Sequence, residues 1–399
     1  MTDHEMKDGW PLVAASLVGV TFGLAAIPFY TLGLFAPPLR AAFGWSQGEV
    51  MATLSVMTLC SIAGAPVVGL MVNRWGARRV AIPSLGAFGL GLMALAASDE
   101  SLPRWYATWA LLSLGGAGTL PVTWTRAITA RFARRRGLAL GIALMGTGLF
   151  GFVGKPLTGL LIDRFGWRGA FVGVGLLPIA LGVPVALALF RDGPMVRREV
   201  AVRWTAQLRE WRLWLLAAAL LPISFALAGP IPNMEAILRG DGLNEGAIRA
   251  VTPFIGLATL VGRLVGGWLL DLVWAPGLAF AILCLPAGAL VLLGSGNVGP
   301  GGALAAVVLI GLAIGIEYDV VAFLVSRYFP GHAYAPLYGI AYTAFLVGAG
   351  FAPALFGRAF DLSGSFAPVL RGSAVALLIG AGALLLLGPY RLSKADEAV

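Results

Sequence analysis

Ionisable side chains are scarce in the apolar stretches of this sequence, and the few present are the candidates for chemistry. Arg263 stands within the apolar run 247–270, and two acids, Glu317 and Asp319, stand within the run 301–326. If the runs are α-helices, which rise 1.5 Å per residue, each of the three residues lies roughly 12 to 15 Å from the polar residue that ends its run. An arginine at such depth is suited to a carboxylate, because its planar guanidinium can bind both oxygens.

The two acids are expected to have different surroundings. They are two positions apart, so on a helix they are offset by about 200°. One would face a pathway and the other would pack against a neighbour. Arg263 then has two interpretations, a substrate-binding cation or a permanent ion pair with Glu317 or Asp319. Both can hold, because a substrate carboxylate could compete with the acid and so link binding to protonation or to gate opening.

Two further cations and several aromatic residues are candidates for substrate binding. Lys155 precedes Pro156 and could supply a second charge, or could reach outward or cap a helix broken at the proline. Arg126 lies nearer the end of its run, where reaching out to polar surroundings is the alternative role. The aromatic candidates for a cavity wall, residue types that more often serve packing or interfacial anchoring, are Tyr30, Trp124, Tyr318, Tyr338 and Tyr342.

The sequence offers no catalytic apparatus. His4 and His332 lie in polar segments, and no nucleophile–base or metal-ligand spacing is present. We therefore expect neither enzyme activity nor a cofactor, with a proton as the candidate coupling ion.

The elements that hold these residues are predicted to be membrane-spanning helices. Hydrophobic residues make up 59% of the chain and charged residues only 12%, about half of the charged fraction usual in a soluble domain. Apolar runs of roughly 20 residues can cross a bilayer as helices, and their continuity argues against strands. Twelve runs are present, at 11–36, 47–72, 79–98, 104–129, 137–162, 168–190, 212–236, 247–270, 275–294, 301–326, 335–358 and 366–390.

A small motif repeats along the chain and indicates duplicated helix bundles. Four of the runs end with the pattern Gly-x-x-x-Asp or Gly-x-x-x-Asn. The two copies in the second half of the chain follow the two in the first half at the same offset in residue number, as expected of a duplicated bundle. The copies are Gly69–Asn73, Gly159–Asp163, Gly267–Asp271 and Gly357–Asp361, and all but the third add a glycine three residues later. We predict an all-α membrane protein with twelve transmembrane helices in two pseudo-symmetric six-helix bundles. The bundles would cover 1–190 and 212–399, with a basic cytoplasmic linker at 191–211.

The distribution of basic residues predicts orientation and partners. Lys and Arg concentrate in the connections that share a side with both termini, which places the termini in the cytoplasm. This distribution explains the net charge of +9 without a nucleic-acid partner. The basic linker would contact anionic headgroups of the bilayer. We expect a monomer in a bacterial inner membrane.

The stretch Gly69-x-x-x-Asn73-Arg74-x-Gly76-x-Arg78-Arg79, within six plus six helices, resembles the major facilitator superfamily. That resemblance implies acidic and basic residues that pair at a cytoplasmic gate. The superfamily carries Asp and Arg where this chain has Asn73 and Ala77, so charge pairing in the first half would be weaker. A basic loop that only sets topology is the alternative. The gating candidates are Asn73, Arg74, Asp163, Asp271 and Asp361, with Glu317 and Asp319 for coupling.

Two stretches resemble the signatures of the monocarboxylate porters, one at Asp8–Trp10 and the other at 132–143. The segment from Glu317 to Phe329 resembles their bacterial, oxalate–formate-type branch. In that family an arginine on the eighth helix binds the substrate carboxylate, and it corresponds to Arg263. The aspartate that takes part in proton coupling in animal members corresponds to Thr259, so that scheme does not carry over unchanged.

The resemblance and the residues together predict a secondary transporter of small organic anions, foremost monocarboxylates. It would work by rocker-switch alternating access around a midplane site, with proton coupling open. The alternatives are an efflux facilitator for drugs or metabolites with the same fold, and a transport-inactive membrane sensor.

Overall fold

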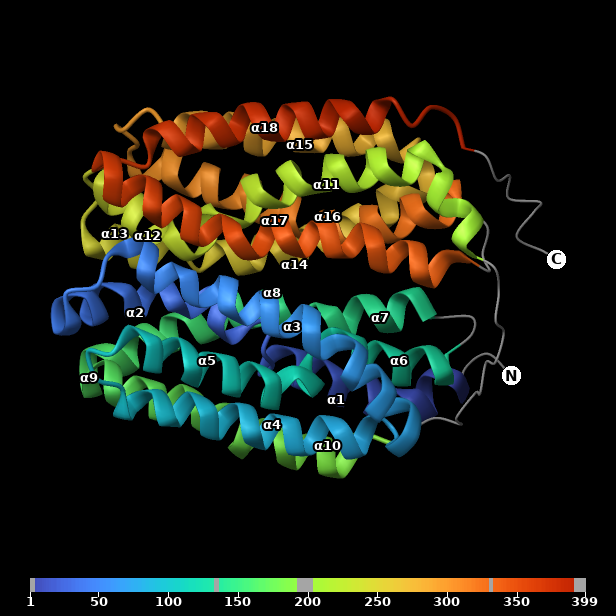
Figure 1. Ribbon diagram of the computed structural model, residues 1–399, viewed down its shortest axis with the longest axis horizontal. Coiled ribbons are helices and arrows are strands. Elements are labelled where there is room, and N and C mark those ends of the chain that lie inside the picture. Colours follow the sequence, from blue (N-terminus) through green and yellow to red (C-terminus); the bar gives the residue numbers. More distant parts are fainter. Residues whose placement is uncertain (1–3, 133–135, 192–203, 330–332, 391–399) are drawn as a thin grey trace. The chain divides into compact units, whose positions relative to one another are not determined.

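The computed structural model describes residues 4–132, 136–191, 204–329 and 333–390, with Figure 1 showing their helices. Backbone contacts divide the chain into two compact units, residues 1–197 and 198–399, here called the N-unit and the C-unit. Every regular element among the described residues is a helix. Each unit is described by itself below. The predicted linker 191–211 falls largely outside the described residues.

The described residues of the N-unit form ten α-helices. They are α1 (His4–Thr21), α2 (Ile27–Phe43), α3 (Gln47–Trp75), α4 (Ala77–Ala94), α5 (Leu102–Gly116), α6 (Pro121–Arg131), α7 (Arg136–Leu144), α8 (Gly146–Leu149), α9 (Lys155–Leu177) and α10 (Val183–Leu189). Two π-helical turns, Phe150–Gly154 and Pro178–Gly182, connect α8 to α9 and α9 to α10. The predicted apolar runs of this half are all helical, but several are divided.

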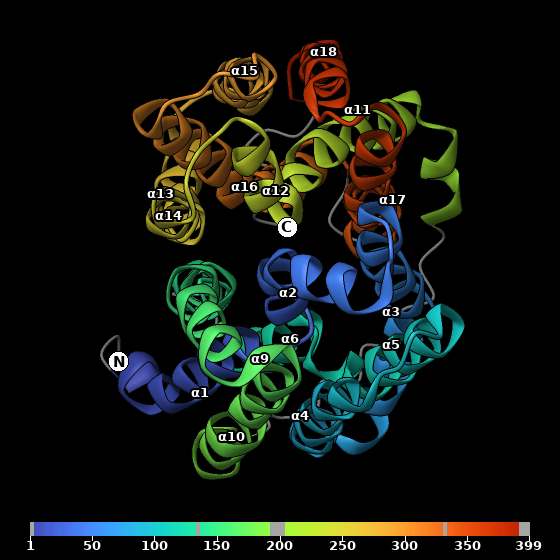
Figure 2. The same cartoon turned by 90° about the vertical axis from the view of Figure 1, so that its left-hand side faces the viewer.

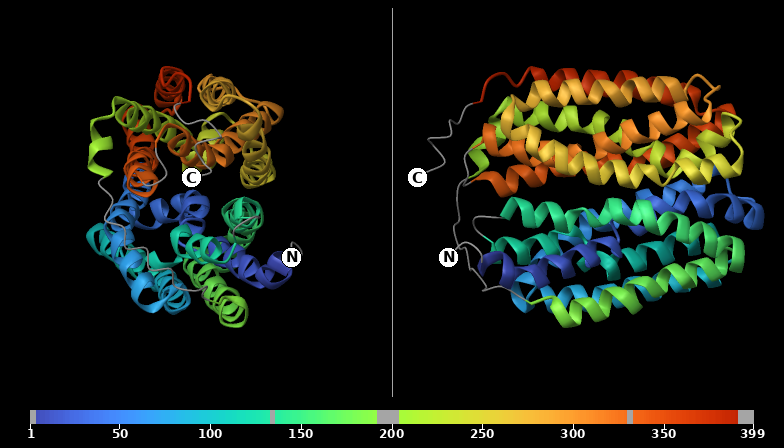
Figure 3. Two further views of the ribbon diagram at one scale, coloured as in Figure 1. Left: turned by 90° about the vertical axis from the view of Figure 1, so that its right-hand side faces the viewer. Right: turned by 180° about the vertical axis from the view of Figure 1, so that it is seen from behind.

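In the C-unit, the part of the chain that the structure describes forms eight α-helices. They are α11 (Trp211–Ala228), α12 (Pro230–Gly240), α13 (Glu245–Val251), α14 (Phe254–Leu272), α15 (Ala275–Leu293), α16 (Pro300–Tyr328), α17 (Tyr334–Ser363) and α18 (Ala367–Leu385). In this unit α14 packs along α16, α11 along α17 and α18, and α15 along α18, as the end-on view of Figure 2 shows. Within each unit the long helices run side by side (Figure 3).

Nine helical stretches of the described chain are long and apolar enough to cross a bilayer. This number is below the twelve predicted runs because helix breaks and mergers change the segmentation. The stretch Gly137–Leu189 contains two predicted runs, joined across Gly166. The runs 11–36 and 104–129 are each divided into two shorter helices.

The breaks in these two runs meet at Thr119. The Leu24 N–H, between α1 and α2, donates to Thr119 Oγ1 at 2.9 Å, and that hydroxyl donates to the Gly116 carbonyl at 2.7 Å. The Trp124 indole donates to the Thr119 carbonyl at 3.0 Å. In hydrocarbon an unpaired backbone group costs several kcal/mol, so a helix can break only where such partners exist.

In three of its four copies, the repeated motif ends in a glycine that the backbone conformation requires. Gly76, Gly166 and Gly364, the glycines that follow Asn73, Asp163 and Asp361, have φ of +89°, +67° and +70°. A residue with a Cβ is disfavoured in that region, which explains glycine at these turns. At the third copy Trp274 has φ −62°, so that chain reversal is built differently.

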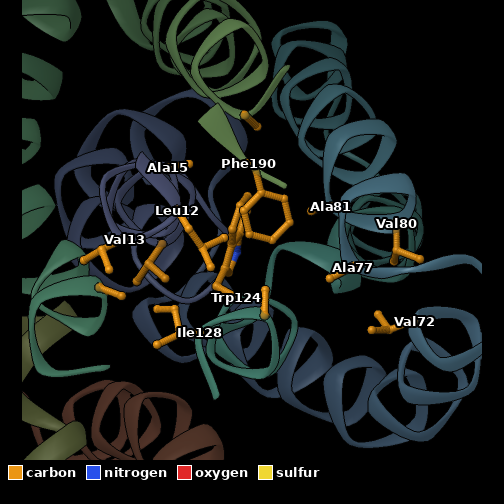
Figure 4. Close-up of a cluster of buried hydrophobic side chains, with 14 of the residues drawn as sticks. Leu12, Val13, Ala15, Val72, Ala77, Val80, Ala81, Trp124, Ile128 and Phe190 are labelled. Atoms are coloured by element: carbon orange, nitrogen blue, oxygen red, sulfur yellow. The ribbon is translucent and has the colours of Figure 1, made fainter. Parts of the chain in front are cut away.

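The core of the N-unit contains a large aromatic pair. The Trp124 and Phe190 rings lie 4.7 Å apart, edge to face, among Leu12 and Val13 of α1 and Ile128 of α6 (Figure 4). A Cβ added at Gly19 would lie 2.2 Å from the Trp124 ring, so α1 approaches this ring closely. The indole is therefore held both by packing and by its hydrogen bond to Thr119.

The two signature stretches touch each other in the N-unit. A Cβ added at Gly9 would lie 2.3 Å from the Phe132 ring, and Phe132 is buried. Gly9 is thus required for the close approach of the start of α1 to the end of α6. Arg134 and Arg135 of the second stretch lie outside the described residues.

The outer faces of both units are apolar and uncovered. Leu70, Leu111 and Leu362 are each about two thirds or more exposed. Large exposed hydrophobic surfaces are a liability in water and the expected exterior in a bilayer.

Candidate functional site

Four glycines bring α14 and α16 into close contact in the C-unit. An added Cβ would lie 2.2 Å from the Leu312 carbonyl oxygen at Gly262, and 2.2 Å from the Ile316 side chain at Gly266. At Gly315 it would lie 2.2 Å from the Thr259 carbonyl oxygen and 2.7 Å from the Arg263 nitrogen. Gly311 is equally close to α14. Small residues allow such backbone contact in membranes, and here they fix the position of Arg263 against α16.

Arg263 lies within electrostatic reach of two polar side chains on other helices. It interacts with the carboxyl group of Asp319 on α16 and with the hydroxyl group of Tyr338 on α17. Arg263 is 7% exposed, and Asp319 is half-buried. A buried guanidinium near an acid and a hydroxyl group can also donate charge-assisted hydrogen bonds to a substrate carboxylate.

The two acids of α16 have different environments, as the helical offset predicts. Asp319 interacts with Arg263, whereas Glu317 is 6% exposed and its Oε1 has no hydrogen-bond partner among the described residues. Burying a carboxylate without a partner is costly, and the neutral, protonated form avoids most of that cost. Of the two acids, Asp319 is therefore the one within electrostatic reach of Arg263.

An aromatic ladder extends along α17 next to this cluster. The rings of Tyr334, Tyr338, Tyr342 and Phe345 stack in succession, with centroids 5.8, 5.6 and 5.6 Å apart and planes within 12° of parallel. The spacing is about one helical turn, so the four rings share one face of the helix. Tyr338 and Tyr342 were predicted as candidates from the sequence, but the alignment of the four rings was not.

The N-unit candidates fall in different environments. Lys155 is 2% exposed and begins α9 directly after the π-helical turn; such turns occur frequently at functional sites. Tyr30 is 4% exposed, and its ring packs edge-on against Phe29 at 5.8 Å. Arg126 is exposed on α6. Lys155 is therefore the buried cation of this unit.

The gating candidates lie at helix ends. Asn73 and Arg74 are exposed at the end of α3, with Arg74 beside the Trp75 ring at 5.9 Å. Asp163 is exposed on α9, and Asp361 is half-buried on α17. The side chains of Asp271 and Tyr318 lie outside the described part of the chain.

Two buried polar residues of α12 were absent from the sequence-based candidates. Asn233 is fully buried, and its side-chain amide donates to the Gly229 carbonyl at 3.0 Å and to the Pro353 carbonyl of α17 at 3.1 Å. Glu235, two residues later, is 4% exposed. Their signal in the sequence was the helix break at Gly229 and Pro230, which frees backbone groups that Asn233 satisfies.

Comparison with known families decides the membership of this chain. A family model described as the Major Facilitator Superfamily matches residues 18–353. The chain belongs to the major facilitator superfamily. This superfamily member also shares its fold with a solved structure, a mutant of the nucleoside transporter NupG. That match has TM-score 0.74 at 12% identity and covers 95% of this chain and 100% of the other. The predicted all-α, twelve-helix fold is confirmed.

Several relatives of this superfamily member are named as transporters or resistance proteins. Human monocarboxylate transporter 11 is 29% identical over 284 residues, which cover 67% of this chain and 57% of the relative. Bovine monocarboxylate transporter 13 is 30% identical over 277 residues, covering 67% and 63%. The chloramphenicol resistance protein of Streptomyces lividans is 29% identical over 270 residues, covering 65% and 67%. The match thus spans about three fifths of the two monocarboxylate transporters' own length.

Proposed function

We propose that this major facilitator protein is a secondary transporter of small monocarboxylates. The observation that carries the proposal is the buried Arg263, placed by the α14–α16 contact within reach of Asp319 and Tyr338. The similarity to monocarboxylate transporters supports a carboxylate as the partner of this arginine.

Binding would be coupled to a change in the charge balance of the cluster. A substrate carboxylate that binds Arg263 competes with Asp319 for the guanidinium. Asp319 is then left without its counter-charge, and a proton would neutralise it. This exchange would make substrate binding favour proton uptake, which is the requirement for symport. Lys155 would be the substrate-attracting cation of the N-unit, with Tyr30, Tyr318 and Tyr342 as aromatic contacts and Arg126 near the surface.

The remaining assignments follow from charge placement. Both termini would lie in the cytoplasm of a bacterial cell, with the basic linker against anionic headgroups of the inner membrane and the protein working as a monomer. Asn73, Arg74, Asp163, Asp271 and Asp361 would form the turns that open and close during alternating access.

A binding experiment tests the role of Arg263. The detergent-purified protein is titrated with lactate, benzoate, succinate and the uncharged analogue benzamide, and thermal stabilisation is measured. A ligand of the folded state raises the melting temperature by mass action. We expect a monocarboxylate to stabilise the native protein and benzamide to have no effect.

Variants separate binding from structure. Arg263→Gln should weaken carboxylate binding by about 10- to 100-fold, because a charge-assisted hydrogen bond contributes about 1.5–3 kcal/mol. Arg358→Gln, an exposed arginine of α17 in the same unit, is the matched control and should bind like the native protein. Equal stabilisation of Arg263→Gln and native protein would remove the basis of the proposal.

A second function, drug efflux, is favoured by one observation. The Streptomyces lividans chloramphenicol resistance protein is as similar to this chain as the monocarboxylate transporters are. Chloramphenicol is therefore included in the titration. Stabilisation by chloramphenicol alone, unchanged in Arg263→Gln, would support efflux and contradict carboxylate transport.

A further inference from the structure

The ladder on α17 has features that packing alone does not require. Three of its four rings carry a hydroxyl group, and Tyr334, Tyr338 and Tyr342 are only partly buried. Phe345, at the far end, is buried. Near-parallel rings stacked over three turns of one helix present a continuous strip of ring edges along one side of α17.

Tyr338 connects this strip to the candidate carboxylate site. It stacks with Tyr334 on one side and with Tyr342 on the other. No residue of the described chain hydrogen-bonds its hydroxyl group, although Arg263 and Asp319 lie within electrostatic reach. The hydroxyl is thus an available donor next to the arginine. The ring that carries this hydroxyl is the second of the four stacked rings, so it joins the arginine to the aromatic strip.

From this juxtaposition we propose that the transporter selects arylcarboxylates, with Tyr338 and Tyr342 as the specificity-determining residues. The inference rests on the proposed role of Arg263 as the carboxylate anchor. With the carboxylate held there, a planar ring attached to it would lie against the ladder, while the Tyr338 hydroxyl donates to a carboxylate oxygen. An edge-to-face aromatic pair, with the substrate ring lying across the ring edges of the ladder, is favoured over an aliphatic contact of equal area, and a short aliphatic acid would not reach the strip.

The test compares two acids of similar size and charge, benzoate and cyclohexanecarboxylate, whose dissociation constants are measured on the purified full-length protein. We expect benzoate to bind about 3- to 10-fold more tightly. The preference should fall to about onefold in Tyr338→Leu and in Tyr342→Leu, whereas Tyr338→Phe, which retains the ring, should keep most of it. Phe360→Leu, which removes a ring of α17 stacked on Phe366 outside the ladder, is the matched control and should leave the preference intact.

The outcomes distinguish this inference from the proposed function. If both acids bind equally to the native protein and Arg263→Gln abolishes both, the carboxylate site stands and the aromatic selectivity is refuted. A benzoate preference that persists in both leucine variants likewise refutes it. If lactate binds the native protein and neither benzoate nor cyclohexanecarboxylate does, the aromatic selectivity alone is refuted. If no monocarboxylate binds, lactate included, or benzamide binds as well as benzoate, the carboxylate function itself fails and this inference fails with it.

Discussion

Replacing Gly315 with alanine tests whether the α14–α16 contact positions the candidate site. The added methyl group would lie 2.2 Å from the Thr259 carbonyl oxygen and 2.7 Å from the Arg263 backbone nitrogen. Both neighbours are backbone atoms, so neither can turn aside as a flexible side chain would. The helices must separate, by about 1 Å if ordinary contact is to be restored.

The expected cost follows from that separation. Overpacking of this kind destabilises a well-packed interior by about 1–3 kcal/mol, and in a protein of this size a melting temperature lower by several degrees results. Arg263 would also move relative to Asp319 and Tyr338. Displacement of a binding group by about 1 Å can reduce function by one to two orders of magnitude. We therefore expect carboxylate uptake to fall by at least about tenfold.

The assay combines thermal unfolding of the purified variant with uptake in proteoliposomes. The matched control is Gly288→Ala, because Gly288 is also inside a helix of the C-unit and an added Cβ there meets nothing within 4 Å. That control should be neutral or slightly stabilising, since alanine favours helix over glycine. If Gly315→Ala unfolds and transports like Gly288→Ala, the helix contact does not determine the geometry of the site.

Three further predictions concern the folded state. Thr119→Val should lower the free energy of unfolding by about 1–3 kcal/mol because the buried Leu24 N–H loses its acceptor. Thr119→Ser keeps the hydroxyl group and should retain the native stability. Equal melting temperatures of the two variants would contradict the role of this hydrogen bond. Burial raises the pKa of Asp241, in the turn after α12, to about 6. The folded state therefore holds this proton more tightly than the unfolded chain, and stability decreases as pH rises from about 4 through 6. Asp241→Asn should have a higher melting temperature than the native protein, and the difference should grow as pH rises over this range. After allowance for solvent screening, the variant gains about 1 kcal/mol in free energy of unfolding. A difference in melting temperature that does not change with pH would refute the raised pKa of Asp241. Gly9→Ala should reduce stability through its clash with the Phe132 ring, whereas Gly141→Ala, with open space around its Cβ, should not; melting curves of the pair decide.

Some of this protein could be predicted because the responsible signals are local in the chain. Continuous apolar runs predict membrane helices, since hydrocarbon cannot solvate a backbone that is not internally bonded. The glycines at 76, 166 and 364 mark turns because their backbone φ is positive. Arg263, Lys155 and Glu317 attracted attention as rare ionisable residues in apolar runs, and the structure buries all three.

Other features depend on how helices rotate, break and approach one another, and single runs do not contain that information. The sequence proposed Glu317 or Asp319 as the partner of Arg263, and the rotation of α16 relative to α14 brings Asp319 within electrostatic reach of the arginine. The helix break before Asn233 and Glu235 went unrecognised because their run looked continuous in hydrophobicity.

What the sequence by itself determined is therefore the membrane class, the duplicated bundles and a short set of buried charges, because composition and periodicity suffice for each. Only the tertiary structure decided which charges face one another, that Gly9 packs on Phe132, and that the ladder of α17 leads from Arg263. These outcomes depend on backbone approach at a few glycines, and the contact between two helices is set by both surfaces at once.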